Sequence, residues 1–478
     1  MTTAGASDVV SEGAMQRARC DLLVTNAFVI SMDADRTLFP DGAIAIADGR
    51  IVDVGPAARI ASVFRPDQTI DARGAPVHPG FVECHVHLLH TARGAFPDSL
   101  DYADALNLYA RWWDALSEED DYRGSLLAIV EMVRHGVTCF AEAGTLLNPA
   151  AAAAAVEAVG IRASLCDGFV WDQGHVLPLE RAPASLERSL GVLGSQLWRN
   201  RDPDALVRGH VGAYGMDTCS MELVAAAKAC ADEAGVIFCQ HQSFEEEDVS
   251  AQRRELGTAP VLYMAEHGIL DANTTFAHMN VLDPDEQKAV AESGMSIVWN
   301  VSSSMVWGVG GTRHGRHSQF HREGVTVGLG ADACNSSCRF DPGLQALLAV
   351  LTAREKELDR KALGAEDALE MLTIKGAQAI GMADQIGSLE PGKRADLVIR
   401  SMDGPEMMPG LDPLQSVVFS GASKAVGTVI VNGSVVVDNG HAARVDEAQV
   451  FAQACETSRD IMRRIGMIEV PQIWPQVR

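Results

Sequence analysis

Two histidines separated by a single residue, His85 and His87, come directly after an apolar stretch that is typical of a β-strand. Side chains on a strand alternate between its two faces, so both imidazoles are predicted to point to the same side. Two neutral imidazoles on one face can form half of a zinc-type site. An HxH pair alone has low specificity, so the prediction depends on further ligand-type residues elsewhere in the chain.

Three such residues end later strand-like runs: His241, His278 and Asp332. Barrel enzymes keep their catalytic groups at the carboxyl ends of the strands. Four imidazoles and one carboxylate that meet at one barrel mouth suit a single Zn²⁺ or Fe²⁺ ion with an open position for water. The sequence therefore predicts a mononuclear metal site built from these five residues.

The middle of the chain alternates between strand-like and helix-like segments from about residue 79 to residue 387. A helical pattern at 126–134 precedes a strand pattern at 138–141, and a helical pattern at 222–234 precedes a strand pattern at 236–240. This repeated alternation predicts a parallel-sheet α/β fold and fits a (β/α)₈ barrel.

Both ends of the chain are instead rich in strands. Each end contains two apolar runs around a tight-turn dipeptide, Asp48-Gly49 near the start and Asn432-Gly433 near the end, and such dipeptides are strong hairpin signals. Neither end is long enough to make a good sandwich by itself. We therefore expect one small β-sandwich domain built from both chain ends.

The expected division of the 478 residues follows from these patterns. Residues 1–78 form the first part of the β-sandwich, and residues 79–388 form the TIM barrel. Residues 389–478 form the second part of the sandwich together with a terminal helix. At about 150 residues per domain the length alone suggests about three domains, but one domain split across both ends needs only two.

Composition limits the partners and the compartment. The chain has 39 Lys and Arg against 64 Asp and Glu, a net charge of −25, which argues against nucleic acid and anionic membranes as partners. A small neutral or cationic substrate is expected instead. The ten cysteines include no CxxC pair, and there is neither a signal-peptide pattern nor a membrane-length apolar run. A cytoplasmic protein with reduced thiols is predicted.

Three stretches resemble the amidohydrolase superfamily: PGFVECHVH at 79–87, GLGADACNSS at 328–337 and IGSLEPGKRADLV at 386–398. Within it the chain is similar to the branch of triazine hydrolases and adenosine-type and cytosine-type deaminases. The resemblance runs from residue 21 to about residue 440. It implies a barrel flanked by a small β-sandwich, hydrolysis by a metal-activated water, and a homo-oligomer.

The resemblance also implies roles for single residues. His85, His87, His241 and Asp332 match the positions that hold one divalent metal, with Zn²⁺ expected and Fe²⁺, Mn²⁺ or Co²⁺ as alternatives. Asp332 matches the catalytic carboxylate that takes a proton from the attacking water. His278 matches the catalytic histidine that polarises the substrate or orients the water. Two-metal members carry a carboxylated lysine on a middle strand, which is absent here, so one metal is expected.

The chain departs from the deaminase pattern at two positions. Deaminases of the branch carry a glutamate three residues after the metal-binding histidine, where this chain has Phe244, followed by acidic residues that could replace it. Tyr214 is the best match to a purine-contacting histidine. The candidate substrate contacts are Phe244, Tyr214, His278, Trp307 and Arg93. Arg93 has the alternative role of holding its loop.

Ammonia leaves poorly unless it is protonated, so the missing glutamate favours a substrate with a better leaving group. We therefore expect cleavage of a C–N bond, or a C–S or C–Cl bond, in a small neutral substrate such as a substituted urea, carbamate, anilide or triazine-like heterocycle. The alternative is an aminohydrolase that releases ammonia from a purine, pterin or pyrimidine. A non-catalytic relative is disfavoured because all five ligand-type positions are intact. His314, His317 and His321 would share one side of a helix, which leaves open a role for them as a second metal site.

Overall fold

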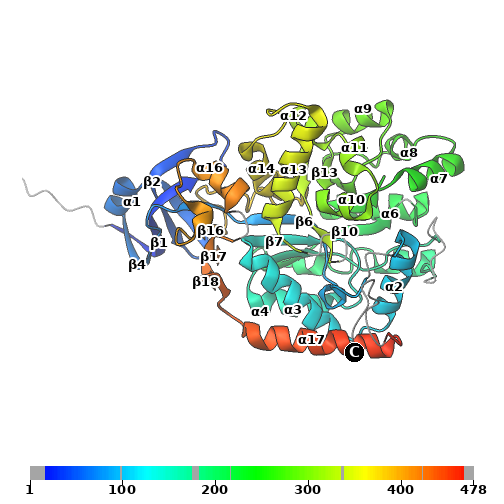
Figure 1. Ribbon diagram of the computed structural model, residues 1–478, viewed down its shortest axis with the longest axis horizontal. Helices are drawn as coiled ribbons and strands as arrows, with labels where there is room; N and C mark the ends of the chain where they lie inside the picture. Colours follow the sequence, from blue (N-terminus) through cyan, green and yellow to red (C-terminus); the bar gives the residue numbers. More distant parts are fainter. Residues whose placement is uncertain are drawn as a thin grey trace, which may run out of the picture.

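The computed structural model describes residues 17–96, 100–174, 182–215, 217–334, 339–421 and 424–467. Figure 1 shows a sheet-rich end, built from blue and orange segments, beside a larger body of strands and helices. Within these residues the main strands form one nine-stranded sheet and two five-stranded sheets. The nine-stranded sheet makes up the sheet-rich end, and the two smaller sheets lie in the larger body.

The two smaller sheets are parallel throughout. The order in one is β15-β6-β7-β8-β9 and in the other β10-β11-β12-β13-β14. Their strands are β6 (Phe81–His87), β7 (Val137–Glu142), β8 (Arg162–Leu165), β9 (Val207–Gly209), β10 (Val211–Gly215), β11 (Phe238–Gln242), β12 (Thr274–His278), β13 (Ser296–Trp299), β14 (Thr326–Leu329) and β15 (Asp332–Ala333). A single residue, His210, separates β9 from β10, and two residues separate β14 from β15. The predicted parallel-sheet α/β fold is confirmed, and its arrangement is TIM-barrel-like.

Helices alternate with these strands along the chain. They are α2 (Tyr102–Asp114), α3 (Glu118–Arg134), α4 (Pro149–Val159), α5 (Leu186–Val192), α6 (Met221–Ala234), α7 (Glu246–Leu256), α8 (Pro260–Glu266), α9 (Pro284–Ser293), α10 (Val301–Trp307), α11 (Gly311–His314), α12 (His317–Arg322), α13 (Pro342–Glu357), α14 (Ala365–Leu372) and α15 (Ile374–Ala379). The helix expected at 126–134 begins earlier, because Ser117 and Asp120 form a capping box. Gly160 ends α4 in the left-handed conformation that favours glycine.

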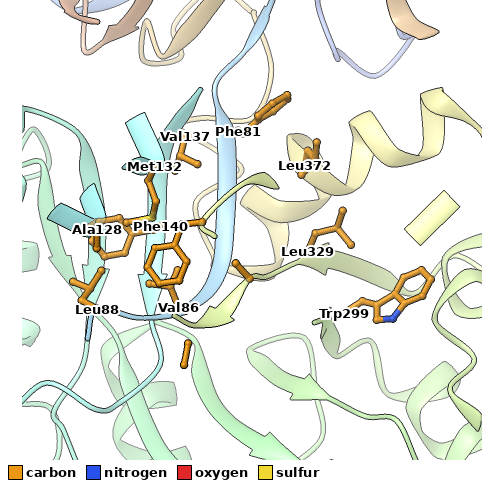
Figure 2. Packing of buried hydrophobic residues seen from close by; sticks show 14 of the residues in the cluster. Phe81, Val86, Leu88, Ala128, Met132, Val137, Phe140, Trp299, Leu329 and Leu372 are labelled. Atoms are coloured by element: carbon orange, nitrogen blue, oxygen red, sulfur yellow. The ribbon is translucent and has the colours of Figure 1, made fainter. Parts of the chain in front are cut away.

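The strands bury two different faces. Phe81, Val86 and Phe140 belong to a large apolar cluster that includes Ala128 and Met132 of α3 (Figure 2). A second cluster gathers residues on or next to β6, β7, β11, β12 and β13 with residues of α15 and the segment that follows it: Val82, Cys84, Cys139, Ala141, Ile237, Ala277, Val298, Ala377, Ala379, Ile380, Met382 and Ile386.

The nine-stranded sheet combines both ends of the chain. Its order is β19-β18-β17-β16-β5-β1-β2-β3, and β4 also pairs with β1. The strands are β1 (Ala18–Ile30), β2 (Leu38–Ala47), β3 (Arg50–Pro56), β4 (Phe64–Asp71), β5 (Pro76–Pro79), β16 (Leu397–Arg400), β17 (Val426–Val431), β18 (Ser434–Asp438) and β19 (His441–Ala442), with α1 (Ala57–Val63) between β3 and β4 and the short α16 (Pro413–Gln415) between β16 and β17. Two hairpins turn at the predicted dipeptides, and all four turn residues have positive φ. The two turns touch, since a Cβ on Gly49 would lie 2.9 Å from the Asn432 carbonyl oxygen.

A buried ion pair joins this sheet to the α/β body. Arg162 of β8 donates from Nε to Asp396 Oδ2 at 3.0 Å and from Nη2 to Oδ1 at 3.2 Å. The backbone N–H of Asn432 donates to the same carboxylate at 2.8 Å. Both ionic side chains are almost fully shielded from solvent. This contact fixes the turn of the β17–β18 hairpin against the body.

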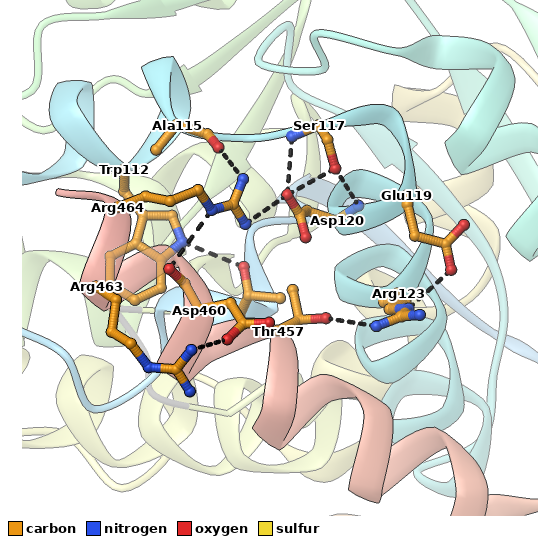
Figure 3. Close-up of polar contacts among 11 residues, drawn as sticks. Trp112, Ala115, Ser117, Glu119, Asp120, Arg123, Thr457, Asp460, Arg463 and Arg464 are labelled. Carbon is orange, nitrogen blue, oxygen red and sulfur yellow. Dashed lines mark hydrogen bonds and ion pairs between the residues drawn. The ribbon is translucent and has the colours of Figure 1, made fainter.

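The last helix, α17 (Glu447–Arg464), packs on α3 rather than on the sheet that precedes it (Figure 1). Its buried residues are Val450, Ala454, Thr457 and Ile461, which form one helical stripe. Arg464 donates to the Ala115 carbonyl and to Asp120 (Figure 3). The chain end thus holds the start of α3 in place.

A search of the described helices for membrane spans finds none with the length and apolar character that crossing a bilayer requires.

Candidate active site

Four side chains meet where the parallel strands end. His87 Nε2 of β6 lies 3.3 Å from Asp332 Oδ1 of β15 and 3.2 Å from His241 Nε2 of β11. His85 Nε2 lies 3.9 Å from the same carboxylate oxygen. The short β15 pairs with β6 and places Asp332 opposite Val86, between the two histidines.

These distances fit one shared cation. Zn²⁺ binds imidazole nitrogen at about 2.0–2.1 Å, so two donors on one tetrahedral ion lie about 3.4 Å apart. The three imidazoles offer nitrogens within 4.8 Å of one another. His85 Nε2 is also buried and makes no hydrogen bond. A donor set of three imidazoles and one carboxylate, with an orphaned nitrogen among them, fits a divalent metal ion.

Three of these four donors are held by polar partners on the side away from the centre. His87 Nδ1 lies 2.8 Å from Thr145 Oγ1, which in turn donates to Glu142 at 3.0 Å. His241 Nδ1 donates to the Tyr214 carbonyl at 2.6 Å. Ser303 Oγ donates to Asp332 Oδ2 at 2.6 Å. Such partners fix the ring tautomers, so that the Nε2 lone pairs and Asp332 Oδ1 remain directed toward the centre.

The protonation states agree with this geometry. Burial lowers the pKa of His85, and the neighbouring His241 and His87 lower it further, so its ring is neutral. Burial alone would raise the pKa of Asp332, but the close approach of His87 and the other nearby imidazoles bring it below its ordinary value. Neutral imidazoles and an ionised carboxylate are the forms that bind a metal.

His278 lies beside the four donors. Its ring centroid is 5.5 Å from those of His85 and His241, and burial lowers its pKa to about 3. Its Nδ1 is buried without a hydrogen-bond partner. His278 and Asp332 have φ values of +71° and +69°, a conformation that β-region strand residues avoid. Backbone outliers at two neighbouring site residues point to a functional constraint.

The three histidines of the 314–321 stretch separate in the structure. His317 stacks on Trp299 and donates from Nε2 to the His278 carbonyl at 2.5 Å, which supports the unusual backbone there. His321 pairs with Asp367 at 3.2 Å, and His314 is exposed. They do not gather as a second metal site.

A pocket of about 760 Å³, counted with its open mouth, stands over the donors. The candidate substrate contacts Tyr214, Phe244, His278 and Trp307 all line it. The Phe244 ring lies 4.6 Å from His278 and 5.6 Å from Tyr102, and Tyr102 lies 5.1 Å from Trp307. These rings make a largely aromatic wall.

Arg93 is placed elsewhere. It forms an ion pair with Glu131 of α3, and His90 Nε2 lies 2.5 Å from the same carboxylate. Although burial opposes it, these partners bring the pKa of Glu131 down to about 2. Arg93 is not among the described residues that line the pocket. Its place agrees with the loop-holding alternative, and its contact with substrate stays a prediction.

The structure adds pocket residues that the sequence interpretation missed. Helix α2 contributes Tyr102, Leu106, Tyr109 and Trp113, and their spacing of four, three and four residues is a visible helical stripe. Asp217 and Asp248 also line the pocket. Asp248, in α7, is one of the acidic residues after Phe244 that the sequence offered as a replacement for the missing acid. No pattern in the sequence marks Asp217, because loop side chains cannot be placed without the fold.

Comparison with known proteins agrees with the fold and shows the family. The profile of the Amidohydrolase family matches residues 77–436. The chain is 30% identical to a 5′-deoxyadenosine deaminase of Methanosarcina barkeri over 93% of this chain and 99% of that one. It is 31% identical to a 5-methylthioadenosine/S-adenosylhomocysteine deaminase of Desulforudis audaxviator over 93% and 100%.

Solved structures show the same fold. An adenosine deaminase of Xanthomonas campestris with bound zinc has a TM-score of 0.85 and 25% identity, covering 94% of this chain and all of that one. Atrazine chlorohydrolase TrzN of Arthrobacter aurescens TC1, complexed with zinc, has a TM-score of 0.82 and 23% identity, covering 91% and 100%. The predicted branch is therefore confirmed. The chain belongs to the amidohydrolase family and is a hydrolase of carbon–nitrogen bonds other than peptide bonds.

Proposed function

We propose that this protein is a zinc-dependent aminohydrolase that removes the amino group from a heteroaromatic ring in a small neutral or cationic molecule. The observation that carries the proposal is the convergence of His85, His87, His241 and Asp332 at the base of an aromatic pocket. The deaminase names of the 30–31% identical relatives favour this reaction over the better leaving group that the sequence suggested.

The four donors would hold one divalent ion. When bound, that ion acidifies a water molecule and so supplies a nucleophile at neutral pH. Asp332, the carboxylate beside these donors, accepts the proton of the water, and Ser303 holds the carboxylate in place through Oδ2. The neutral ring of His278 faces the same space and can polarise the ring nitrogen or orient the water.

The lining suggests the class of substrate. Tyr102, Phe244 and Trp307 offer flat faces on which a heteroaromatic ring can stack. Asp217 and Asp248 add negative charge, and no Lys or Arg occurs among the described lining residues. Such a wall favours neutral or cationic rings over anionic ones. Adenine nucleosides such as 5′-deoxyadenosine are the first compounds to test.

A second candidate is hydrolysis of a substituted urea, carbamate, anilide or chlorinated triazine. Phe244 favours it, because the ring that packs on His278 occupies the place of the acid that protonates ammonia in this branch. A leaving group that needs no such acid would remain reactive.

A panel of adenine nucleosides, aminopyrimidines, phenylureas and chlorotriazines separates the two candidates. The zinc-loaded protein should release ammonia from an adenine nucleoside. Release of organic amine or chloride, with no ammonia from any compound, would overturn the first candidate and support the second.

Replacing Phe244 tests the missing acid directly. Phe244→Glu should increase ammonia release about tenfold or more, since general acids contribute about 10²–10⁴ in rate. Phe244→Gln is the matched control, because glutamine has nearly the shape of glutamate but no carboxyl group. Equal rates in both variants would show that protonation of the leaving group does not limit this enzyme.

The remaining architectural predictions form part of the same proposal. We expect the two parallel sheets to close into one eight-stranded barrel, because the breaks at β9–β10 and β14–β15 each interrupt a single strand. The division at 1–78, 79–388 and 389–478 and the sandwich form of the nine-stranded sheet remain predictions. A cytoplasmic location is supported by the nine described cysteines, which are all free thiols. Assembly as a homo-oligomer rests on the family resemblance.

A further inference from the structure

Beneath the mouth, a second group of metal-type ligands lies on three neighbouring strands. It consists of Cys166, His210 and Cys239, whose donor atoms all lie within 4.8 Å of one another. Cys166 follows β8, His210 separates β9 from β10, and Cys239 lies in β11. Cys166 and His210 are buried, and Cys239 is partly buried.

The imidazole of His210 is held so that one nitrogen faces the cluster. Its Nδ1 lies 2.9 Å from Ser164 Oγ, and its Nε2 is buried with the Cys239 thiol as its neighbour. Metal-binding histidines are commonly held in this way, by a polar partner on the nitrogen that does not bind the metal.

Gly212 makes the space in which the two sulfur atoms converge. It pairs with Cys239 across β10 and β11. A Cβ at this position would lie 2.8 Å from Cys166 Sγ and 3.4 Å from Cys239 Sγ. Any larger residue would therefore push the first thiol away. The absence of a side chain at this point leaves both thiols directed to one place.

Cys239 also lines a small interior space of about 10 Å³, together with His85 and Glu142, which is about enough for one water molecule. This cavity leaves space next to the thiol for a ligand that the protein does not supply. Three protein donors and one such ligand complete a tetrahedral set.

We propose that Cys166, His210 and Cys239 form a second, structural Zn²⁺ site inside the α/β body, distinct from the site at the mouth. Binding releases one proton from each thiol, and the resulting two thiolates balance the two charges of the ion. A buried site without net charge avoids the penalty for an isolated ion. Two thiolates and an imidazole also select zinc over the hard cations Mg²⁺ and Ca²⁺. The ion would tie β8, the β9–β10 strand and β11 together.

Cobalt substitution tests this proposal without reference to activity. The full-length apoprotein is loaded with Co²⁺, and the bound metal and the near-ultraviolet spectrum are measured. Of the two groups of metal-type ligands found among the described residues, the interior cluster alone contains sulfur, so a thiolate-to-cobalt charge-transfer band reports on it. We expect about two equivalents of Co²⁺ and a clear band, because thiolates bind such ions tightly at neutral pH.

Variants assign the band to its ligands. The double variant His85→Asn/His87→Asn should lose one equivalent and keep the band. Cys166→Ser should also lose one equivalent of Co²⁺, and in this variant the charge-transfer band should disappear. Cys139→Ser, which changes a buried thiol outside the cluster, is the matched control and should behave like the wild-type protein.

A wild-type protein that binds one equivalent of Co²⁺ without a charge-transfer band would overturn the proposal, whatever the variants do. Loss of the band in the double histidine variant would overturn it too, because sulfur would then belong to the mouth site. Failure of the proposed reaction is a separate result, since the substrate panel reads products and this experiment reads sulfur–metal bonds.

Discussion

Two aspartates of this protein are about equally buried and yet have opposite surroundings. Asp396, at the junction with the nine-stranded sheet, receives two hydrogen bonds from Arg162 and one from the Asn432 N–H. Asp332, at the mouth, receives one hydrogen bond from Ser303 and directs its other oxygen at two imidazoles without a permanent charge. A buried charge that is fully paired stabilises the junction. A buried charge that is incompletely paired marks the place for a cation.

The largest effect should come from removing the charge at the mouth. Asp332→Asn should lower kcat/KM about 10³-fold or more, because the variant cannot accept the proton of the water. Its thermal unfolding temperature should stay close to that of the wild-type protein. Asp396→Asn is the matched control and should leave kcat/KM nearly unchanged. Near-normal turnover in Asp332→Asn would contradict a catalytic role for Asp332 as opposed to the structural role of Asp396.

The junction should respond in stability instead. Arg162→Met leaves Asp396 buried and unpaired, so the free energy of unfolding should fall by about 3–5 kcal/mol. Urea unfolding measures this loss, and kcat/KM of the folded fraction should not change. The double variant Arg162→Met/Asp396→Leu should recover much of the stability. A loss below about 1 kcal/mol in the single variant would contradict a role for this pair in holding the sheet.

The ion pair of Arg93 and Glu131 should affect the stability of the fold rather than turnover, as the pair of Arg162 and Asp396 does. The pKa of Glu131 is lowered from 4.5 to about 2, so its charge stabilises the folded protein above pH 4.5. That contribution is lost as the pH falls from 4.5 toward 2. The stability difference between the wild-type protein and Glu131→Gln should therefore be constant near neutrality and shrink in this range. A difference independent of pH would exclude the ion pair as its source.

The smallest effect is expected at the partly exposed end of α17. Arg464→Ala removes the contacts with Asp120 and the Ala115 carbonyl (Figure 3). Exposed pairs contribute at most about 1 kcal/mol, so the midpoint of urea unfolding should move only slightly. A shift as large as that of Arg162→Met would mean that α17 is as important to the fold as the buried junction.

Local patterns in the sequence predict much of the fold. The two hairpins follow from Asp48-Gly49 and Asn432-Gly433, since those residues favour the positive φ values that the turns adopt. The ends of apolar runs also indicated that His85, His241 and Asp332 would lie at one edge of parallel strands. The structure brings these residues together because parallel strands align their carboxyl ends.

Contacts between distant segments could not be foreseen in the same way. Arg93 pairs with Glu131 of α3, and no local pattern announces that partner. Cys166, His210 and Cys239 contain no CxxC signal, and they meet only because three strands pair in one register. The pocket aromatics of α2 were visible as a helical stripe, but which surface they face depends on how the helix folds over the mouth.

The most direct test of the account is to measure ammonia release together with bound metal. The protein is stripped with a chelator and titrated with Zn²⁺ while an adenine nucleoside is turned over. The account predicts that the stripped protein is inactive and that the rate rises with bound zinc, whereas Asp332→Asn stays inactive at every zinc concentration. Full turnover by the wild-type protein without bound metal would contradict the account.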